Sequence, residues 1–91
     1  MITMIEELKQ EEAKYHKLYE EKSQILDELK ADAFKLAINQ IEKKGLKETY
    51  LYFKAERDKH SQDNKLSRNL SHAYSLVVGK LWKYYKNVQK E

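Results

Sequence analysis

The sequence predicts an all-α protein, a long helical hairpin or three-helix bundle in a single domain. Apolar residues recur every three or four positions through most of the chain. The 91 residues include no proline and only two glycines, Gly45 and Gly79, so helix breakers are few. No cysteine is present, which leaves helix packing and self-association, rather than disulfides, as the sources of stability.

The first helix is predicted over residues 4–44. Thr3 and Glu6 have the spacing of a capping box, and Gly45 follows two lysines where a helix C-cap is expected. An unbroken helix of this length would span roughly 60 Å, longer than one small domain covers. We therefore expect its N-terminal half to form a coiled-coil-like seam with a second copy in a homodimer. The seam residues are Met4, Ile5, Leu8, Tyr15, Leu18, Tyr19, Ile25, Leu26 and Leu29.

Two further helices are predicted, over residues 46–60 and 64–89. Tyr50 and Phe53 keep helical spacing, although the letters TYLYF around them also favour a strand. The run SQDN, residues 61–64, contains four turn or cap formers, so a break is expected there; a continuous helix through 46–64 is the alternative. The inward stripe of the last helix comprises Leu66, Leu70, Ala73, Val77, Leu81, Tyr84 and Val88.

Positive charge is concentrated in the last helix. Residues 1–45 carry a net charge of −2, residues 46–63 are neutral and residues 64–91 carry +5, within an overall charge of +3. At about 100° per residue, the back of this helix forms a stripe without acidic residues. We assign to it candidate phosphate-binding residues, namely Lys65, Arg68, His72, Lys83, Lys86 and Lys90.

An aromatic edge lies between that stripe and the inward face of the last helix. Val78, Trp82 and Tyr85 follow one another at spacings of four and three residues. Because tryptophan and tyrosine are favoured at interaction hot spots, the sequence predicts a partner-binding surface. Its residues are Val78, Trp82, Tyr85, Lys83 and Lys86.

We expect a small non-enzymatic interaction protein, an adaptor or regulator that self-associates and docks an acidic protein surface through the last helix. The alternative is a nucleic-acid-binding regulator that contacts phosphates through the basic stripe. In a third interpretation, the basic face contacts only solvent and Trp82 of the third helix fills the hydrophobic core. No span or signal peptide is evident, so we expect a cytoplasmic protein that does not bind membranes. The Lys-, Tyr-, Asn- and Ile-rich composition favours a bacterial or phage origin.

Catalytic, cofactor-binding and metal-binding residues are not expected. Glu12 with His16, and Glu56 with His60, are carboxylate–imidazole pairs four residues apart. The inward Glu-x-x-His motif of di-iron bundles has a spacing of three, so these pairs are typical of solvated helix faces. The serines show no His–Asp pattern, and no glycine-rich phosphate loop occurs.

Two short stretches resemble known families. Residues 31–46, ADAFKLAINQIEKKGL, resemble the central oligomerisation helix of H-NS-type nucleoid proteins over about a sixth of the chain, with an apolar spacing that differs by one residue. Residues 50–71 are similar to the third-to-fourth helix region of small bacteriocin immunity proteins, which are cytosolic helical bundles. Neither stretch contains a diagnostic motif, so no residue role is transferred.

Overall fold

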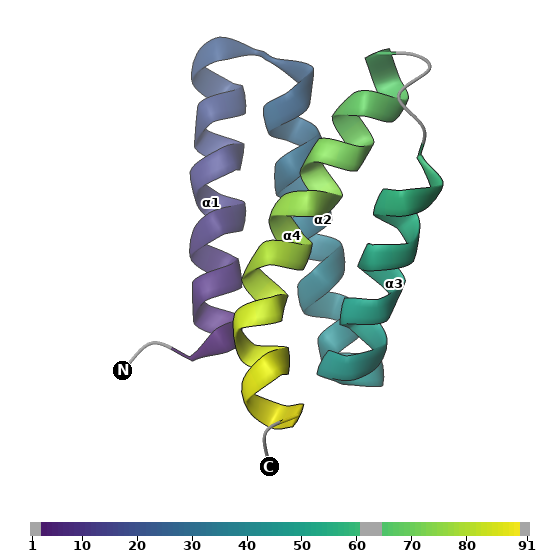
Figure 1. Cartoon of the computed structure of the whole chain (residues 1–91). Coiled ribbons are helices and arrows are strands. Elements are labelled where there is room, and N and C mark those ends of the chain that lie inside the picture. Colours follow the sequence, from purple (N-terminus) through teal and green to yellow (C-terminus); the bar gives the residue numbers. More distant parts are fainter. Residues whose placement is uncertain (1–2, 61–64, 90–91) are drawn as a thin grey trace.

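The computed structural model describes residues 3–60 and 65–89, apart from the side chains of Lys65, Val88 and Gln89. It contains four helices, α1 (Met4–Lys22), α2 (Ile25–Lys44), α3 (Leu46–Lys59) and α4 (Lys65–Gln89), and no strand within the described residues. The helices run alternately up and down, with the two ends of the chain at the same end of the molecule (Figure 1). The all-α prediction is therefore confirmed.

The prediction of one helix over residues 4–44, and with it the count of three helices, is wrong. The chain reverses at Ser23 and Gln24, so α1 and α2 form a hairpin. Ser23 adopts a left-handed conformation with φ 56° and ψ 33°, and its N–H donates to the carbonyl oxygen of Tyr19 at 2.7 Å. Gln24 then begins α2 by accepting a hydrogen bond from the N–H of Asp27 at 3.1 Å.

Four of the expected seam residues of α1 pack against the core of the same chain. Leu8 is fully buried, with Met4, Ile5 and Tyr15 packed against the same core. The ring of Tyr15 stacks on Phe34 of α2, with ring centroids 5.9 Å apart and planes at 7°. Most of the apolar face of α1 that predicted a dimer is thus packed against the core of its own chain, and the dimer no longer follows from the length of the first helix.

The predicted end of a helix at Gly45 is confirmed. Gly45 has φ 90°, and its N–H donates to the carbonyl oxygen of Ile41 at 2.9 Å. The buried hydroxyl of Thr49 donates back to the carbonyl oxygen of Gly45 at 2.8 Å. This one-residue turn sends α3 back alongside α2. At the other end of the chain, the hydroxyl of Thr3 accepts the N–H of Glu6 at 3.1 Å, as a helix N-cap does.

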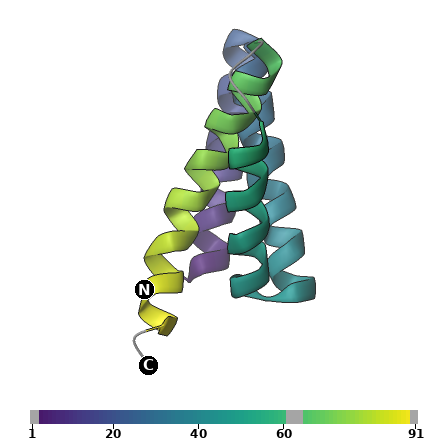
Figure 2. The same cartoon turned by 45° about the vertical axis from the view of Figure 1, so that its right-hand side comes forward.

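The helices α3 and α4 are separate, as the sequence predicts. The helix α3 ends at Lys59, and the N–H of His60 still donates to the carbonyl oxygen of Glu56 at 3.2 Å. The predicted break at 61–64 and a helix start at Asn64 lie outside the described residues; α4 is described from Lys65. Seen after a 45° turn, α3 and α4 run side by side (Figure 2).

All four helices contribute to one hydrophobic core. Its largest fully buried side chains include Phe34 of α2, Phe53 of α3 and Leu81 of α4. Aromatic rings line the α3–α4 contact, where Phe53 meets Tyr74 edge-on at 5.5 Å. Within the described residues, no helix is both long and apolar enough to cross a membrane.

Candidate functional site

Trp82 is the large aromatic side chain that α4 holds at the surface. It is 45% exposed, although two rings support it from the protein side. Its ring centroid lies 5.9 Å from that of Tyr50 on α3 and 6.3 Å from that of Tyr85. Tyr50 and Tyr85 themselves stack at 4.5 Å. Trp82 is therefore held in a defined position while nearly half of its surface faces solvent.

The other two residues of the predicted aromatic edge lie in the core. Val78 is 6% exposed and Tyr85 is 8% exposed, because α3 covers this side of α4. Both belong to the same cluster of buried residues as Phe53. Of the three residues, Trp82 presents substantial surface to a partner, while Val78 and Tyr85 support the surface from below.

A groove between α3 and α4 opens next to Trp82. It is shallow and largely open to solvent, with a volume of about 460 Å³. The apolar lining comes from Tyr50, Val78 and Trp82, whereas Lys54, Arg57 and Ser75 supply polar groups. Gly79 also lines it, and a Cβ atom at that position would meet no atom within 4 Å. The groove is thus open above the backbone of α4.

The groove is cationic, because the described residues that line it include two basic side chains and no acidic one. Lys54 is exposed. The guanidinium Nε of Arg57 lies 3.2 Å from a carboxylate oxygen of its sequence neighbour Asp58, which is 63% exposed. An exposed ion pair of this kind is weak, so Arg57 can still turn towards an incoming anion.

The predicted phosphate-binding residues are in part brought together. Arg68, His72 and Lys86 are exposed on α4, and their spacing places them near the line of Gly79 and Trp82 along the helix. The side chain of Lys65, and Lys90 as a whole, lie outside the described residues. Lys83 is engaged within the protein, since its Nζ lies 3.1 Å from a carboxylate oxygen of Glu7.

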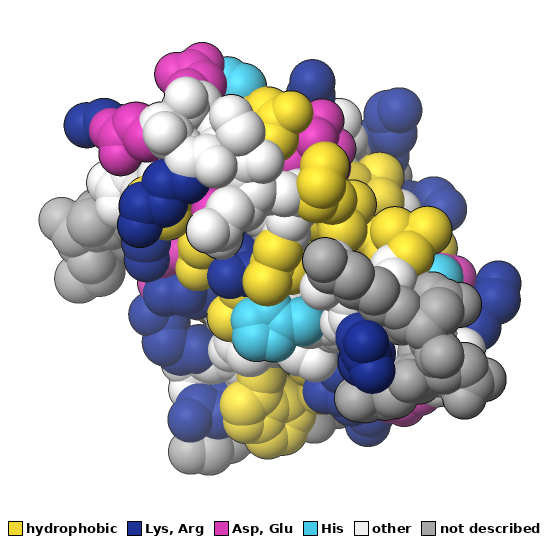
Figure 3. Space-filling view, turned by 90° about the horizontal axis from the view of Figure 1, so that it is seen from above, with side chains coloured by type: hydrophobic (Ala, Val, Ile, Leu, Met, Phe, Trp, Pro, Cys, Tyr) yellow, Lys and Arg dark blue, Asp and Glu magenta, His cyan; other side chains and the backbone are white. Residues whose placement is uncertain are grey.

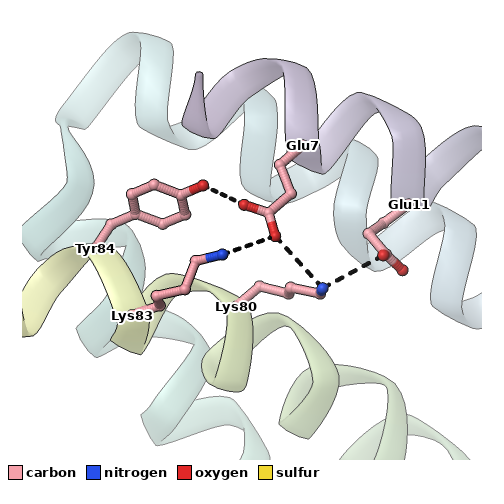
Figure 4. A network of polar contacts seen from close by, with 5 residues as sticks. All are labelled: Glu7, Glu11, Lys80, Lys83 and Tyr84. Carbon is pink, nitrogen blue, oxygen red and sulfur yellow. Dashed lines mark hydrogen bonds and ion pairs between the residues drawn. The ribbon is translucent and has the colours of Figure 1, made fainter. Parts of the chain in front are cut away.

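Glu7 of α1 gathers the polar groups on the α1 side of α4 (Figure 4). Its carboxylate accepts hydrogen bonds from the hydroxyl of Tyr84 and from the ammonium of Lys83. Lys80 lies 3.4 Å from Glu7 and 3.4 Å from Glu11. Because the Glu7 side chain is only 17% exposed, these contacts are better shielded than ordinary surface ion pairs. We call this group of five residues the Glu7 cluster.

The Glu7 cluster shifts the pKa values of its members. The hydrogen bond from Tyr84 has the largest effect and lowers the pKa of Glu7. Burial opposes this by raising the pKa, and the ammonium of Lys83 lowers it further. The same hydrogen bond, with burial and the negative charge of Glu7, raises the pKa of Tyr84 to about 12. Burial lowers the pKa of Lys80, but the carboxylates of Glu11 and Glu7 outweigh it and raise the pKa. The cluster thus favours ionised carboxylate and neutral phenol.

The carboxylate–imidazole pairs remain local. His60 lies 3.6 Å from Glu56, whereas His16 pairs with Glu20 at 3.2 Å instead of Glu12. Both pairs join positions four residues apart on one helix. Among the described residues, no group of three or more His, Cys, Asp or Glu side chains is placed to hold a metal ion.

A second hollow lies at the opposite end of the molecule, where α1 turns into α2 and α4 begins. Its volume is about 600 Å³, and the described residues that line it are uncharged. Ile25 and Leu66 line it and are 56% and 58% exposed, so Leu66 departs from the predicted inward stripe. Figure 3, which looks onto that end, shows hydrophobic side chains at the surface.

Sequence reasoning missed the contribution of α3 to the groove. Tyr50, Lys54 and Arg57 are spaced by four and three residues, which places them on one face of α3. The sequence shows that spacing, but it does not show that this face of α3 packs beside Trp82. Glu7 was missed for the same reason, since it lies 77 positions from Tyr84.

Comparison with models of known protein families finds no match, and neither curated proteins nor solved structures give one.

Proposed function

We propose that this chain is a small non-enzymatic interaction protein, an adaptor or regulator, that docks an acidic protein partner through α4 and the adjoining face of α3. The observation that carries the proposal is Trp82, which remains 45% exposed while Tyr50 and Tyr85 hold its ring. Tryptophan is one of the residues enriched at the hot spots of protein interfaces. The basic residues Lys54 and Lys86 are exposed on the same two helices and suit an acidic surface.

The proposal is tested by capture of partners from a bacterial lysate, with and without nuclease. We expect Trp82→Ala, Lys54→Glu and Lys86→Glu to lose the proteins that the wild type retains. Lys35→Glu is the matched control, since Lys35 is exposed on α2 and lines neither hollow. Each variant must keep the helical circular dichroism of the wild type. Retention of the same proteins by all variants would contradict the docking surface.

The proposal includes self-association, which is now supported by the second hollow rather than by a seam in α1. Ile25 and Leu66 expose more than half of their surface beside each other in that hollow, and burial of such apolar area favours association. Sedimentation equilibrium over a range of concentrations tests this, with Leu66→Ser expected to weaken the dimer. A wild-type chain that stays monomeric throughout would exclude it.

Nucleic-acid binding is the second candidate, favoured by the exposure of Arg68, His72 and Lys86 on α4. Cations along a helix can neutralise successive phosphates, and Trp82 offers a stacking surface for a base. Affinity for a single-stranded or duplex oligonucleotide should then fall steeply with salt. Lys86→Glu should reduce that salt dependence, whereas Lys35→Glu should not. Absence of binding at low salt would dismiss this candidate.

A further inference from the structure

Gly79 lines the groove, and the packing of α4 does not require a glycine at this position. It lies inside a helix of 25 residues, where glycine is a poor helix former. It does not have positive φ, unlike Gly45, so the backbone does not require glycine. A Cβ atom there would meet no atom within 4 Å, so no neighbouring helix requires it either. The missing side chain leaves space above α4 between Trp82 and Ser75.

That space has an apolar base and a basic edge. Tyr50 and Val78 form the base and are 7% and 6% exposed, so a side chain that enters the groove meets carbon surface. Lys54 and Arg57 lie on the α3 side. They follow Tyr50 by four and seven residues, so both lie within about two helical turns of it. A ligand that satisfies both parts must combine an apolar side chain with nearby negative charge.

We propose that the α3–α4 groove binds an acidic peptide segment of the partner that carries one large apolar side chain. The apolar side chain enters the space above Gly79 beside Trp82, and flanking carboxylates of the segment meet Lys54 and Arg57. A segment of protein suits this groove better than a bare anion, because an anion would leave the exposed surface of Trp82 uncovered. This inference rests on the proposed docking function and names the chemistry of the docked element.

The probe is a displayed library of random 12-residue peptides selected against the wild-type chain. We expect the enriched peptides to contain a large apolar residue flanked by Asp or Glu. One enriched peptide is then synthesised, together with a form in which Gln and Asn replace its acidic residues. Trp82 is the single tryptophan of the chain, so its fluorescence reports binding directly, and the amide form should bind at least about tenfold more weakly.

Gly79→Leu is the decisive variant, because it fills the groove without removing any contact. It should raise the Kd of the enriched peptide by about tenfold or more, while the thermal unfolding midpoint stays at or above that of the wild type. Gly79→Ala should give a smaller increase in Kd. Lys54→Glu should weaken binding of the acidic peptide and have little effect on its amide form. Lys35→Glu should change neither affinity.

Three results would overturn the inference: a selection without enrichment, enriched peptides without acidic residues, or equal binding to wild type and Gly79→Leu. Capture of partners from a lysate distinguishes failure of the groove inference from failure of the proposed docking function. If Trp82→Ala abolishes capture but Gly79→Leu does not, the docking surface stands and the groove is not its anchor point. If neither variant affects capture, the docking function itself fails.

Discussion

Glu7 joins the first turn of α1 to the C-terminal half of α4 through three side chains. Its carboxylate accepts from Tyr84 and Lys83 and lies 3.4 Å from Lys80. Several donors on one largely buried carboxylate stabilise a fold more than isolated surface pairs do, because solvent screens them less. Removal of the carboxylate also leaves the donors without their acceptor.

We expect Tyr84→Phe and Glu7→Gln each to lower the free energy of unfolding by about 1 kcal/mol or more. The double variant should lose less than the sum of the two, with a coupling of about 0.5 kcal/mol or larger, because the two residues share one contact. Urea unfolding of the four proteins measures this cycle. Tyr19→Phe is the control, since the structure gives its hydroxyl no contact among the described residues. Full additivity would show that the Tyr84–Glu7 contact is not stabilising.

The same contact predicts a pH dependence. The pKa of Glu7 is lowered in the folded state, so its stabilisation is present above the ordinary value of 4.5 and is lost as pH falls through the lowered value. The pKa of Tyr84 is raised to about 12, so its part persists below pH 10 and is lost as pH rises through about 12.

The difference in unfolding free energy between wild type and Glu7→Gln should therefore be constant from about pH 6 to pH 9 and shrink below about pH 4. Urea titrations at several pH values measure it. A difference that grows on acidification would have the wrong sign.

At the scale of a helix, replacement of the two glycines by alanine should change the free energy of unfolding in opposite directions. Neither position has an atom within 4 Å of an added Cβ, but Gly45 has φ 90° and Gly79 does not have positive φ. Gly45→Ala should cost about 1–2 kcal/mol of backbone strain. Gly79→Ala should add about 0.5–1 kcal/mol of stability, because alanine is the better helix former.

Thermal and urea unfolding of the two alanine variants check this pair. Each variant is the control for the other, since both add the same methyl group to open space. Equal shifts in the same direction would mean that the turn at Gly45 does not depend on its positive φ.

The sequence shows Gly45 clearly as a helix end, and the break at Ser23 much less so. Gly45 follows two lysines and has no side chain to oppose positive φ. Ser23 and Gln24 also occur inside helices, so neither marks a reversal. The available signal was electrostatic: Lys22 at the end of α1 precedes Asp27 and Glu28 in the first turn of α2, as helix dipoles favour.

The candidate site was also predictable from the sequence only in part. The periodicity of α4 correctly places Ala73, Val77 and Leu81 inside and Trp82 at the surface, because 100° per residue is a property of that helix alone. Whether Tyr85 faces solvent or the core depends on the neighbouring helix, and α3 covers it. Tyr50 beside Trp82 comes from α3, which the turn at Gly45 places. Glu7 beside Lys83 comes from α1, which the reversal at Ser23 places.

At the scale of the molecule, we expect the turn at Ser23 and Gln24 to decide whether α1 folds back onto α2. A continuous helix through Ser23 and Gln24 would separate α1 from α2 and expose the face around Leu8. Ser23→Ala with Gln24→Ala favours that helix, because alanine disfavours the left-handed conformation. We expect this variant to populate a dimer in which α1 packs on the partner's core, as in a domain swap.

Analytical ultracentrifugation of the variant against the wild type measures the change. Ser23→Gly is the matched control, since glycine adopts φ 56° freely; it should favour the hairpin and keep the sedimentation of the wild type. A double-alanine variant with the same sedimentation as Ser23→Gly would show that core packing, rather than the turn, fixes the reversal.

The turns also set how fast this bundle can form. Two residues separate α1 from α2 and one separates α2 from α3, so successive helices meet after little chain diffusion. Helical proteins with such local contacts fold in about microseconds to milliseconds. The Glu7 cluster contains contacts of much longer range, since its partners on α1 and α4 lie 69 to 77 positions apart. Closure of the two chain ends is therefore the entropically costly step, and we expect the first turn of α1 to exchange its amide hydrogens early.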